Sequence, residues 1–302
     1  MTVHPNSALR STAIVTASWR GDFDRCRLLC ESIDRRVSGQ TRHLILVEGR
    51  DAKLFKPLAG RNREIVDERD VLPAWLRAFP DPTHWGRRRV WLSPFGPPLR
   101  GWHVQQLRRI VVGTLIGEDV MVSVDSDVVF LKPFDVGAFA DGSGRVRFFH
   151  RPQALRGMEG ASLAEHRAWS RRAGALLGIE APAETETGYI ATLIAWRTAS
   201  VRAMAERIEA VSGRSLVAAL ASSRVLSECV IYGRFVDEVE KRPDLHHPSE
   251  EALCHIYWRG AAMDAQALSG FAAALQPHQV AAGIQSFTGT DPLLIRRAAG
   301  LC

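Results

Sequence analysis

The chain has 302 residues, of which 46% are hydrophobic and 24% are charged. These fractions are typical of globular proteins and exclude a disordered, collagen-like or coiled-coil chain. Its 39 Lys and Arg residues outnumber its 33 Asp and Glu residues, which gives a formal net charge of +6. Because the basic residues are spread along the whole chain, we attribute most of this surplus to composition and only a part to an anionic partner.

The cysteines and the apolar segments indicate a protein that needs neither disulfides nor a membrane span. The five cysteines form no CxxC pair, and Cys26 and Cys30 are about one helical turn apart, which suits core packing better than a disulfide or zinc site. No apolar run approaches the roughly 20 residues of a membrane span, and the first residues lack the apolar core of a signal peptide. We therefore expect a cytoplasmic protein, for which peripheral contact with a membrane stays open.

The first half of the chain alternates between strand and helix patterns, which predicts a mostly parallel central sheet flanked by helices, an α/β fold. Asp22 and Asp24 can each cap the helix that follows the first strand. Pro73–Arg100 contains six prolines and is predicted to be irregular, a kind of long connection that is often functional. The predicted strands are Thr12–Ala17, His43–Val47, Arg63–Val66 and Val120–Val124, and further helices are predicted over Asp51–Leu58 and His103–Thr114.

After Asp141 the composition becomes rich in Ala and Arg, but no linker separates this region from the first half as a second domain. We expect a single domain, with residues 12–135 as a nucleotide- and metal-binding half and residues 136–302 as a divergent acceptor-binding half. Helices are predicted over Leu163–Leu177 and Thr198–Val211, and strands near Val146–His150 and Ile190–Trp196.

Asp125 and Asp127 follow the apolar strand VMVSV and are two residues apart. In extended geometry, both carboxylates would point to the same side, at the edge where parallel sheets bind ligands. Oxygen ligands of this kind suit Mg²⁺ or Mn²⁺, which would in turn bridge phosphate oxygens. The alternative is that Asp-Ser-Asp merely forms a turn.

Five short motifs occur in order along the chain. Thr16-Ala17-Ser18 closes the first strand, Gly101-Trp102-x-x-Gln105-Gln106 opens a helix, and Asp125-Ser126-Asp127 follows the central strand. Ser227-Glu228-x-x-x-Tyr232-Gly233 and His255-Ile256-Tyr257-Trp258 come later. This set, which spans most of residues 12–260, resembles the GT-A (Rossmann-like) glycosyltransferases, most closely a little-characterised bacterial family within that fold.

The resemblance implies a transferase that moves a sugar from a UDP- or GDP-linked donor to a saccharide, lipid-linked or small-molecule acceptor. Mn²⁺ or Mg²⁺ would be held by Asp125 and Asp127, with His255 as a possible third ligand. Glu228 would deprotonate the acceptor hydroxyl or hydrogen-bond to it, although it is equally a first-turn glutamate favoured by the helix dipole. The implied donor-site residues are Thr16, Ala17, Ser18, Asp22, Asp51, Trp102, Gln105, Gln106, Arg109, Asp125 and Ser126.

The helix of the second motif has two distinct faces. Trp102, Gln105, Gln106 and Arg109 share one face of the helical wheel, which we expect to line the donor or acceptor site rather than plain solvent. The family has a lysine more often at the position of Arg109. Because a planar guanidinium replaces a single ammonium group, Arg109 can contact the ligand differently from that lysine. Asp51 lies at the end of a strand, where it can meet the nucleoside or cap a helix.

Other readings of the sequence stay open. A metal-dependent nucleotidyltransferase would share the carboxylates but should carry a glycine-rich phosphate loop, whereas ASWRGDFD has one glycine. A non-catalytic nucleotide- or glycan-binding protein would keep the fold without turnover. The Arg87-Arg88-Arg89 run beside Trp85 and Trp91 has no accompanying nucleic-acid motif, so no nucleic-acid partner is expected. Glu184 and Glu186 are alternative carboxylates, and Tyr189, Trp196 and Arg197 could form a sugar-binding wall, unless Trp196 is core.

Overall fold

The computed structural model describes residues 11–85 and 88–301. A five-stranded sheet lies at its centre, with the strand order β12-β8-β1-β3-β4. β8, β1, β3 and β4 are parallel, and β12 is antiparallel to β8. The prediction of an α/β fold with a mostly parallel sheet is therefore confirmed. The strands are β1 (Thr12–Ala17), β3 (Arg42–Val47), β4 (Arg63–Asp67), β8 (Val120–Ser123) and β12 (Ile194–Arg197).

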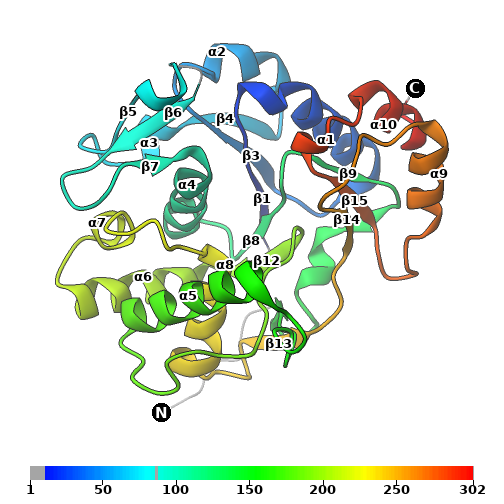
Figure 1. The fold of residues 1–302 in the computed structure, drawn as a ribbon. Helices are drawn as coiled ribbons and strands as arrows, with labels where there is room; N and C mark the ends of the chain where they lie inside the picture. The colour runs from blue at the N-terminus through cyan, green and yellow to red at the C-terminus, as the bar shows by residue number, and fades with distance from the viewer. Residues whose placement is uncertain (1–10, 86–87, 302) are drawn as a thin grey trace.

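Helices cover both faces of this sheet (Figure 1). In β1, Ile14 packs with the cluster around α1 (Phe23–Arg36), while its neighbours Ala13 and Val15 pack with the cluster around α4 (Gly101–Leu115). Successive side chains of a strand point to opposite faces, so a strand covered on both sides is buried along its whole length. All six residues of β1 are buried.

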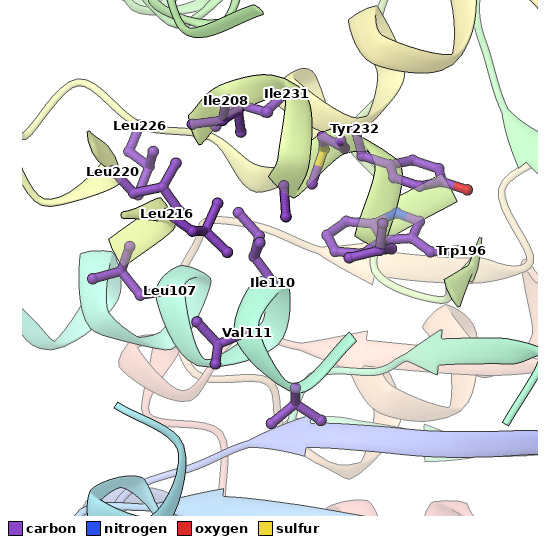
Figure 2. Close-up of a cluster of buried hydrophobic side chains, with 14 of the residues drawn as sticks. Leu107, Ile110, Val111, Trp196, Ile208, Leu216, Leu220, Leu226, Ile231 and Tyr232 are labelled. Atoms are coloured by element: carbon purple, nitrogen blue, oxygen red, sulfur yellow. The ribbon is translucent and has the colours of Figure 1, made fainter. Parts of the chain in front are cut away.

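The largest core cluster joins the two halves of the chain (Figure 2). Leu107, Ile110 and Val111 of α4 lie beneath side chains from the second half, which come from α6, α7, α8 and β12. The elements of this layer are α5 (Gly160–Leu177), α6 (Thr198–Ser212), α7 (Leu216–Leu220) and α8 (Glu228–Arg234), which continues as a π-helix over Phe235–Glu240.

A second, three-stranded sheet packs beside α1, with the order β14-β15-β9. It consists of β14 (Cys254–Tyr257), β15 (Ala281–Ile284) and β9 (Val128–Phe130), and it packs with α9 (Ala265–Ala273) and α10 (Pro292–Ala298). β9 follows β8 in the chain, so the chain crosses from the first sheet to the second at Asp125-Ser126-Asp127. Smaller elements include α2 (Ala52–Phe55), α3 (Glu68–Val71), β2 (Val37–Ser38), β10 (Phe134–Asp135) and the 3-10 helices Arg20–Asp22, Lys56–Leu58, Pro82–His84, Val136–Phe139 and Ser286–Thr288.

The prediction that Pro73–Arg100 is irregular is wrong. This segment forms a three-stranded antiparallel sheet from β5 (Arg77–Pro80), β6 (Arg89–Leu92) and β7 (Leu99–Arg100). Each strand has four residues or fewer, and the only proline within them ends the edge strand β5, where a missing N–H is tolerated. In the Arg run, Arg87 lies outside the described residues, and Arg89 donates to Glu48 at 2.9 Å.

Two further expectations can be compared with the structure. Cys26, Cys30, Cys229 and Cys254 are free and buried, as core packing predicts, and Cys302 lies outside the described residues. His246 and His247 begin β13 (His246–Ser249), which pairs in parallel with β11 (Val146–Phe149). Within residues 11–85 and 88–301, no helix is long and apolar enough to cross a membrane.

Candidate active site

Asp125 and Asp127 lie at the carboxyl end of β8, where the chain turns into β9. Val128 donates its backbone N–H to the Asp125 carbonyl oxygen at 3.2 Å, and Ile284 of β15 donates to the Asp127 carbonyl oxygen at 3.1 Å. Ser126 and Asp127 therefore form a turn and not an extended segment. The expectation that extended geometry points both carboxylates to one side is wrong in this detail, and the two side chains have different partners.

Asp127 is a buried carboxylate with an incomplete set of partners. Its Oδ2 accepts from the backbone N–H of Ser286 at 3.2 Å, while its Oδ1 is buried without a hydrogen-bond partner. Burial and, to a smaller extent, the nearby negative charges of Asp125 and Asp22 raise the pKa of Asp127 to about 7. A cation at Oδ1 would satisfy this oxygen and offset the repulsion.

Asp22 is a third carboxylate of the same group. Ser126 Oγ donates to Asp22 Oδ2 at 3.4 Å, and the side chains of Trp19 and Ser286 also hydrogen-bond to Asp22. Burial raises the pKa of Asp22 despite these bonds. Asp22 occupies the N-cap position of α1, but its side chain accepts no backbone N–H there, so Asp22 does not cap the helix. Asp24 is exposed and pairs with Arg27 at 3.1 Å.

Arg25 supplies positive charge on the inner side of this group. It is 7% exposed and donates to the carbonyl oxygens of Ile284 (2.9 Å) and Thr290 (2.6 Å). Its charge favours the ionised forms of both Asp127 and Asp22. Sequence reasoning missed Arg25, because an arginine two residues into a helix looks like a solvent-facing position.

Arg109 joins the carboxylates to the second half of the chain. Its Nη2 donates to Asp125 Oδ1, and its Nη1 donates to Glu228 Oε1 at 2.9 Å. Burial alone would lower the pKa of Arg109, but Asp125 and Glu228 outweigh burial and raise it. Asp125 keeps 32% of its side chain exposed, so a ligand can still reach this carboxylate.

Glu228 begins α8 and is 6% exposed. Ser227 caps the helix by accepting from the Val230 N–H at 3.4 Å, and the Glu228 N–H donates to Gln106 Oε1 at 3.0 Å. Burial raises the pKa of Glu228, although the Arg109 charge opposes the shift. The amide nitrogen Nε2 of Gln106 is buried without a partner.

The remaining donor-site predictions divide into buried and exposed groups. Ala17 and Ser18 are buried, and Thr16 Oγ1 lies 3.0 Å from His43 Nε2 within the core. Asp51 accepts from the backbone N–H (3.0 Å) and the Nε (2.7 Å) of Arg20, and it makes no cap hydrogen bond with its side chain. It therefore anchors the loop after β1.

On α4, the predicted polar face is exposed at its first residue and mostly buried further along the helix. Trp102 is 48% exposed and lies against Trp169 of α5, with ring centroids 5.9 Å apart. Gln105 is partly buried and Gln106 is 2% exposed. The predicted face therefore leads from an exposed aromatic ring down to the ion pairs of Arg109.

His255 is not brought to the carboxylates. On β14 the His255 ring stacks on Phe271 of α9, with ring centroids 4.3 Å apart. Its strand neighbour Cys254 is close enough to Asp125 and Asp127 that their charges, after burial, raise the pKa of its thiol. Because neighbouring strand residues point to opposite faces, the placement gives no support to His255 as a third ligand. Among the described residues, no group of three or more His, Cys, Asp or Glu side chains is arranged to hold a metal ion.

The predicted sugar-binding wall is dispersed. The Trp196 ring is buried and stacks on Tyr232 at 4.9 Å, which agrees with the core alternative. Arg197 lies opposite Val120 at the far end of β8. Glu184 pairs with Arg171 and Arg167, and Glu186 lies 3.7 Å from Arg167.

Tyr189 instead contributes to a pocket of about 130 Å³ next to α8. The pocket includes Val230, two residues after Glu228, and its polar side chains include Arg151, His166 and Thr187. Asp125 and Asp127 do not line it, nor do they line the open groove of about 540 Å³ between α4, α6 and α7.

The site therefore has an acidic group at the sheet edge and a largely buried arginine that links this group to Glu228. Two residues after Glu228 in α8, Val230 lines the smaller pocket. The chain belongs to a family of unknown function, DUF6492, which matches residues 8–295. No curated protein matches it.

Proposed function

We propose that this protein is a cytoplasmic, metal-dependent glycosyltransferase with a GT-A-like fold, which transfers a sugar from a nucleotide-diphosphate sugar to an acceptor hydroxyl. The main support is the buried, unpartnered Oδ1 of Asp127 beside Asp125, at the edge of a mostly parallel sheet where such folds bind ligands. The ordered motifs that resemble GT-A glycosyltransferases give the second support.

The acidic residues fit a hard divalent cation. Asp125 and Asp127 would hold Mn²⁺ or Mg²⁺, which would supply charge that stabilises the departing nucleoside diphosphate. Because Mg²⁺ typically binds one or two carboxylates and takes its other ligands from water and phosphate, His255 is not needed. Arg109 keeps Asp125 and Glu228 in fixed positions through its two terminal nitrogens.

We assign Glu228 to the acceptor hydroxyl, as its general base or its hydrogen-bond partner. A raised pKa brings a carboxyl group closer to the range in which it can accept and release a proton. Val230, two residues after Glu228 in α8, lines a pocket of about 130 Å³. We assign this pocket to the acceptor, in agreement with an acceptor-binding second half.

The test is calorimetric titration with Mn²⁺ and UDP, GDP or CDP, followed by an assay of nucleoside diphosphate release from the matching sugar donors. We expect one nucleotide to bind only with Mn²⁺, and Asp127→Asn to abolish this binding. Asp24→Asn, which changes an exposed carboxylate near the start of α1, should bind as the wild type does. Failure of every nucleotide to bind with Mn²⁺ would sink the proposal, and binding without turnover would favour a non-catalytic protein.

A further inference from the structure

The small sheet of β5, β6 and β7 has a buried face and an exposed face. Trp91 of β6 and Leu99 of β7 pair across the two strands, and both are buried in the largest core cluster, against α4. Because successive side chains of a strand alternate between the two faces, the strand neighbours of Trp91 and Leu99 lie on the opposite face. The sheet is at the periphery of the molecule, next to α4 (Figure 1).

The exposed face combines apolar and basic side chains. The register places Phe79 beside Val90 and Val90 beside Arg100, which makes one row across the three strands. Arg77 and Leu92 make a second row. Phe79 and Leu92 are exposed, and so are both arginines. None of the three strands contains an acidic residue.

The connection between β5 and β6 extends this surface. The Arg88 carbonyl oxygen accepts from the Asp81 N–H at 2.9 Å, which continues the pairing of the two strands, so alternation places Arg88 on the exposed face. Trp85, in the same connection, is 93% exposed. Arg77, Arg88 and Arg100 form no ion pair with any residue that the structure describes. Three unpaired cations therefore accompany the exposed apolar side chains.

The size of this face favours a membrane over a protein partner. With strands about 4.8 Å apart and about 3.3 Å per residue, the face of the three strands covers roughly 200 Å². Each side of a stable protein interface buries about 800 Å². A membrane surface sets no such minimum, because a few apolar side chains can enter the headgroup region while cations bind anionic lipids. Arginine suits this place, since its apolar stem packs against apolar groups while its charged end stays in a polar layer.

The small sheet is tied to the edge of the central sheet that carries the candidate site. Arg89 of β6 donates to Glu48 at 2.9 Å, and Glu48 directly follows β3. Because β3 and β8 are both parallel to β1, the carboxyl end of β3 lies at the same edge as Asp125. A membrane bound by the small sheet would therefore lie toward the edge with the candidate site.

We propose that the exposed face of β5, β6 and β7, together with Trp85, docks on a membrane surface that contains anionic phospholipids. Phe79, Leu92 and Trp85 enter the headgroup region, and the three unpaired arginines bind lipid phosphates. The inference goes beyond the proposed function and does not rest on it, because it uses none of the residues assigned to the donor, the metal or the acceptor.

Vesicle co-sedimentation with the full chain tests this surface. One set of vesicles is pure phosphatidylcholine, and the other contains equal parts of phosphatidylcholine and phosphatidylglycerol. The wild type should bind the anionic vesicles more than about 10-fold more tightly than the neutral ones, because each arginine near an anionic surface contributes about fivefold. Raising the salt concentration should weaken this binding, since salt screens exposed charges.

The variants separate charge from apolar insertion. Arg77→Gln with Arg88→Gln should weaken binding to anionic vesicles by about 25-fold, whereas Arg77→Lys with Arg88→Lys keeps both charges and should bind as the wild type does. Trp85→Ala should weaken it by about 10-fold or more through lost apolar burial. Trp258→Ala and Arg61→Gln change an exposed tryptophan and an exposed arginine elsewhere and should bind as the wild type does. Urea unfolding checks that each variant is folded.

Several results would overturn the proposal. Equal affinity for the two sets of vesicles, or binding to neither, excludes an anionic membrane. Wild-type affinity in Trp85→Ala and in the double glutamine variant places the membrane contact elsewhere. A dimer in light scattering that Trp85→Ala dissociates assigns the face to a second copy of the chain. A single-stranded oligonucleotide that binds more tightly than the vesicles and is lost in the same variants assigns it to nucleic acid. Each of these results leaves the nucleotide titration with Mn²⁺, and with it the proposed function, unaffected.

Discussion

Arg109 of α4 donates from Nη1 to Oε1 of Glu228 on α8 at 2.9 Å, across a separation of 119 residues in the chain. Its Nη2 donates to Asp125. One buried guanidinium therefore joins the acidic edge of the first half to the first turn of a helix in the second half. The two halves share a core at this point, as Figure 2 shows for the neighbouring apolar residues of α4 and α8.

Removing this cation should destabilise the protein strongly. Arg109→Gln leaves Glu228 buried and unpaired beside Asp125, and breaking one side of a buried ion pair typically costs about 3–5 kcal/mol. The free energy of unfolding from urea titration at pH 7.5 measures the effect. Adding Glu228→Gln to Arg109→Gln should restore part of the loss, because the double variant no longer buries the Glu228 charge. An Arg109→Gln variant within about 1 kcal/mol of wild type would contradict this account.

Asp127→Asn should instead be at least as stable as the wild type. The wild type buries a carboxylate oxygen without a partner, and an unsatisfied buried polar group typically costs about 1–3 kcal/mol, and more if it is charged. A neutral amide removes the charge at nearly the same size. Thermal unfolding without metal at pH 8 measures this difference, with Asp24→Asn as the control. A large loss of stability would show that Asp127 has a structural role.

Most of the central sheet could be predicted from the sequence because each element carries its own local pattern. Thr12–Ala17 is a short, mostly apolar run bounded by Ser11 and Ser18, and the predicted strand coincides with β1. α4 and α6 follow helical periodicity closely enough that their predicted ends lie within two residues of the observed ones. Sequence reasoning fails where pairing depends on distant partners, as in β5–β7, whose strands are too short to show a period of two.

The candidate site could be predicted only in part for a related reason. Asp125 and Asp127 stand out because they follow a strong strand, but the roles of Asp22 and Arg25 depend on Ser286, Ile284 and Thr290, more than 250 residues away. No local signal distinguishes a buried, carbonyl-bound arginine from a solvent-exposed one. The pairing of Arg109 with Glu228 is also invisible before the fold brings α4 and α8 together.

The contribution of His43 to the free energy of unfolding should fall as the pH drops below 6.5. The Nδ1 atom accepts from Arg63 Nε at 3.1 Å, so Nε2 carries the proton and donates to Thr16 Oγ1 at 3.0 Å. Burial, with a smaller contribution from the Arg63 charge, lowers the pKa of His43 to about 3. Between pH 6.5 and 3, the unfolded chain binds the extra proton and the folded chain does not, so stability is lost as the pH falls.

At pH 5 this single histidine should cost about 2 kcal/mol relative to pH 7.5. Urea titrations of wild type and His43→Gln at both pH values measure it, since the variant should lose less stability on acidification. His278→Gln, which changes a partly exposed histidine, is the control and should follow the wild type. Equal pH dependence of His43→Gln and wild type would show that His43 titrates normally in the folded protein.

Arg234 should be the most sensitive buried cation outside the candidate site. Its side chain is fully buried in α8 and forms two hydrogen bonds to Glu238, at 2.5 and 2.7 Å. The same guanidinium also donates to three backbone carbonyl oxygens, those of Ser170 (2.7 Å), Pro182 (2.7 Å) and Ala183 (3.0 Å). It therefore ties α8 to α5 and to the segment after α5.

A lysine cannot replace this fork, because its single nitrogen cannot reach all of these acceptors. Arg234→Lys should lower the free energy of unfolding by about 3 kcal/mol or more, whereas Arg242→Lys, in an exposed pair with Asp244, should change it by less than about 0.5 kcal/mol. Replacing both Arg234 and Glu238 by Met tests which contact matters more. If the ion pair dominates, the double variant regains wild-type stability; we expect it to stay at least about 2 kcal/mol less stable, because three buried carbonyl groups lose their donors.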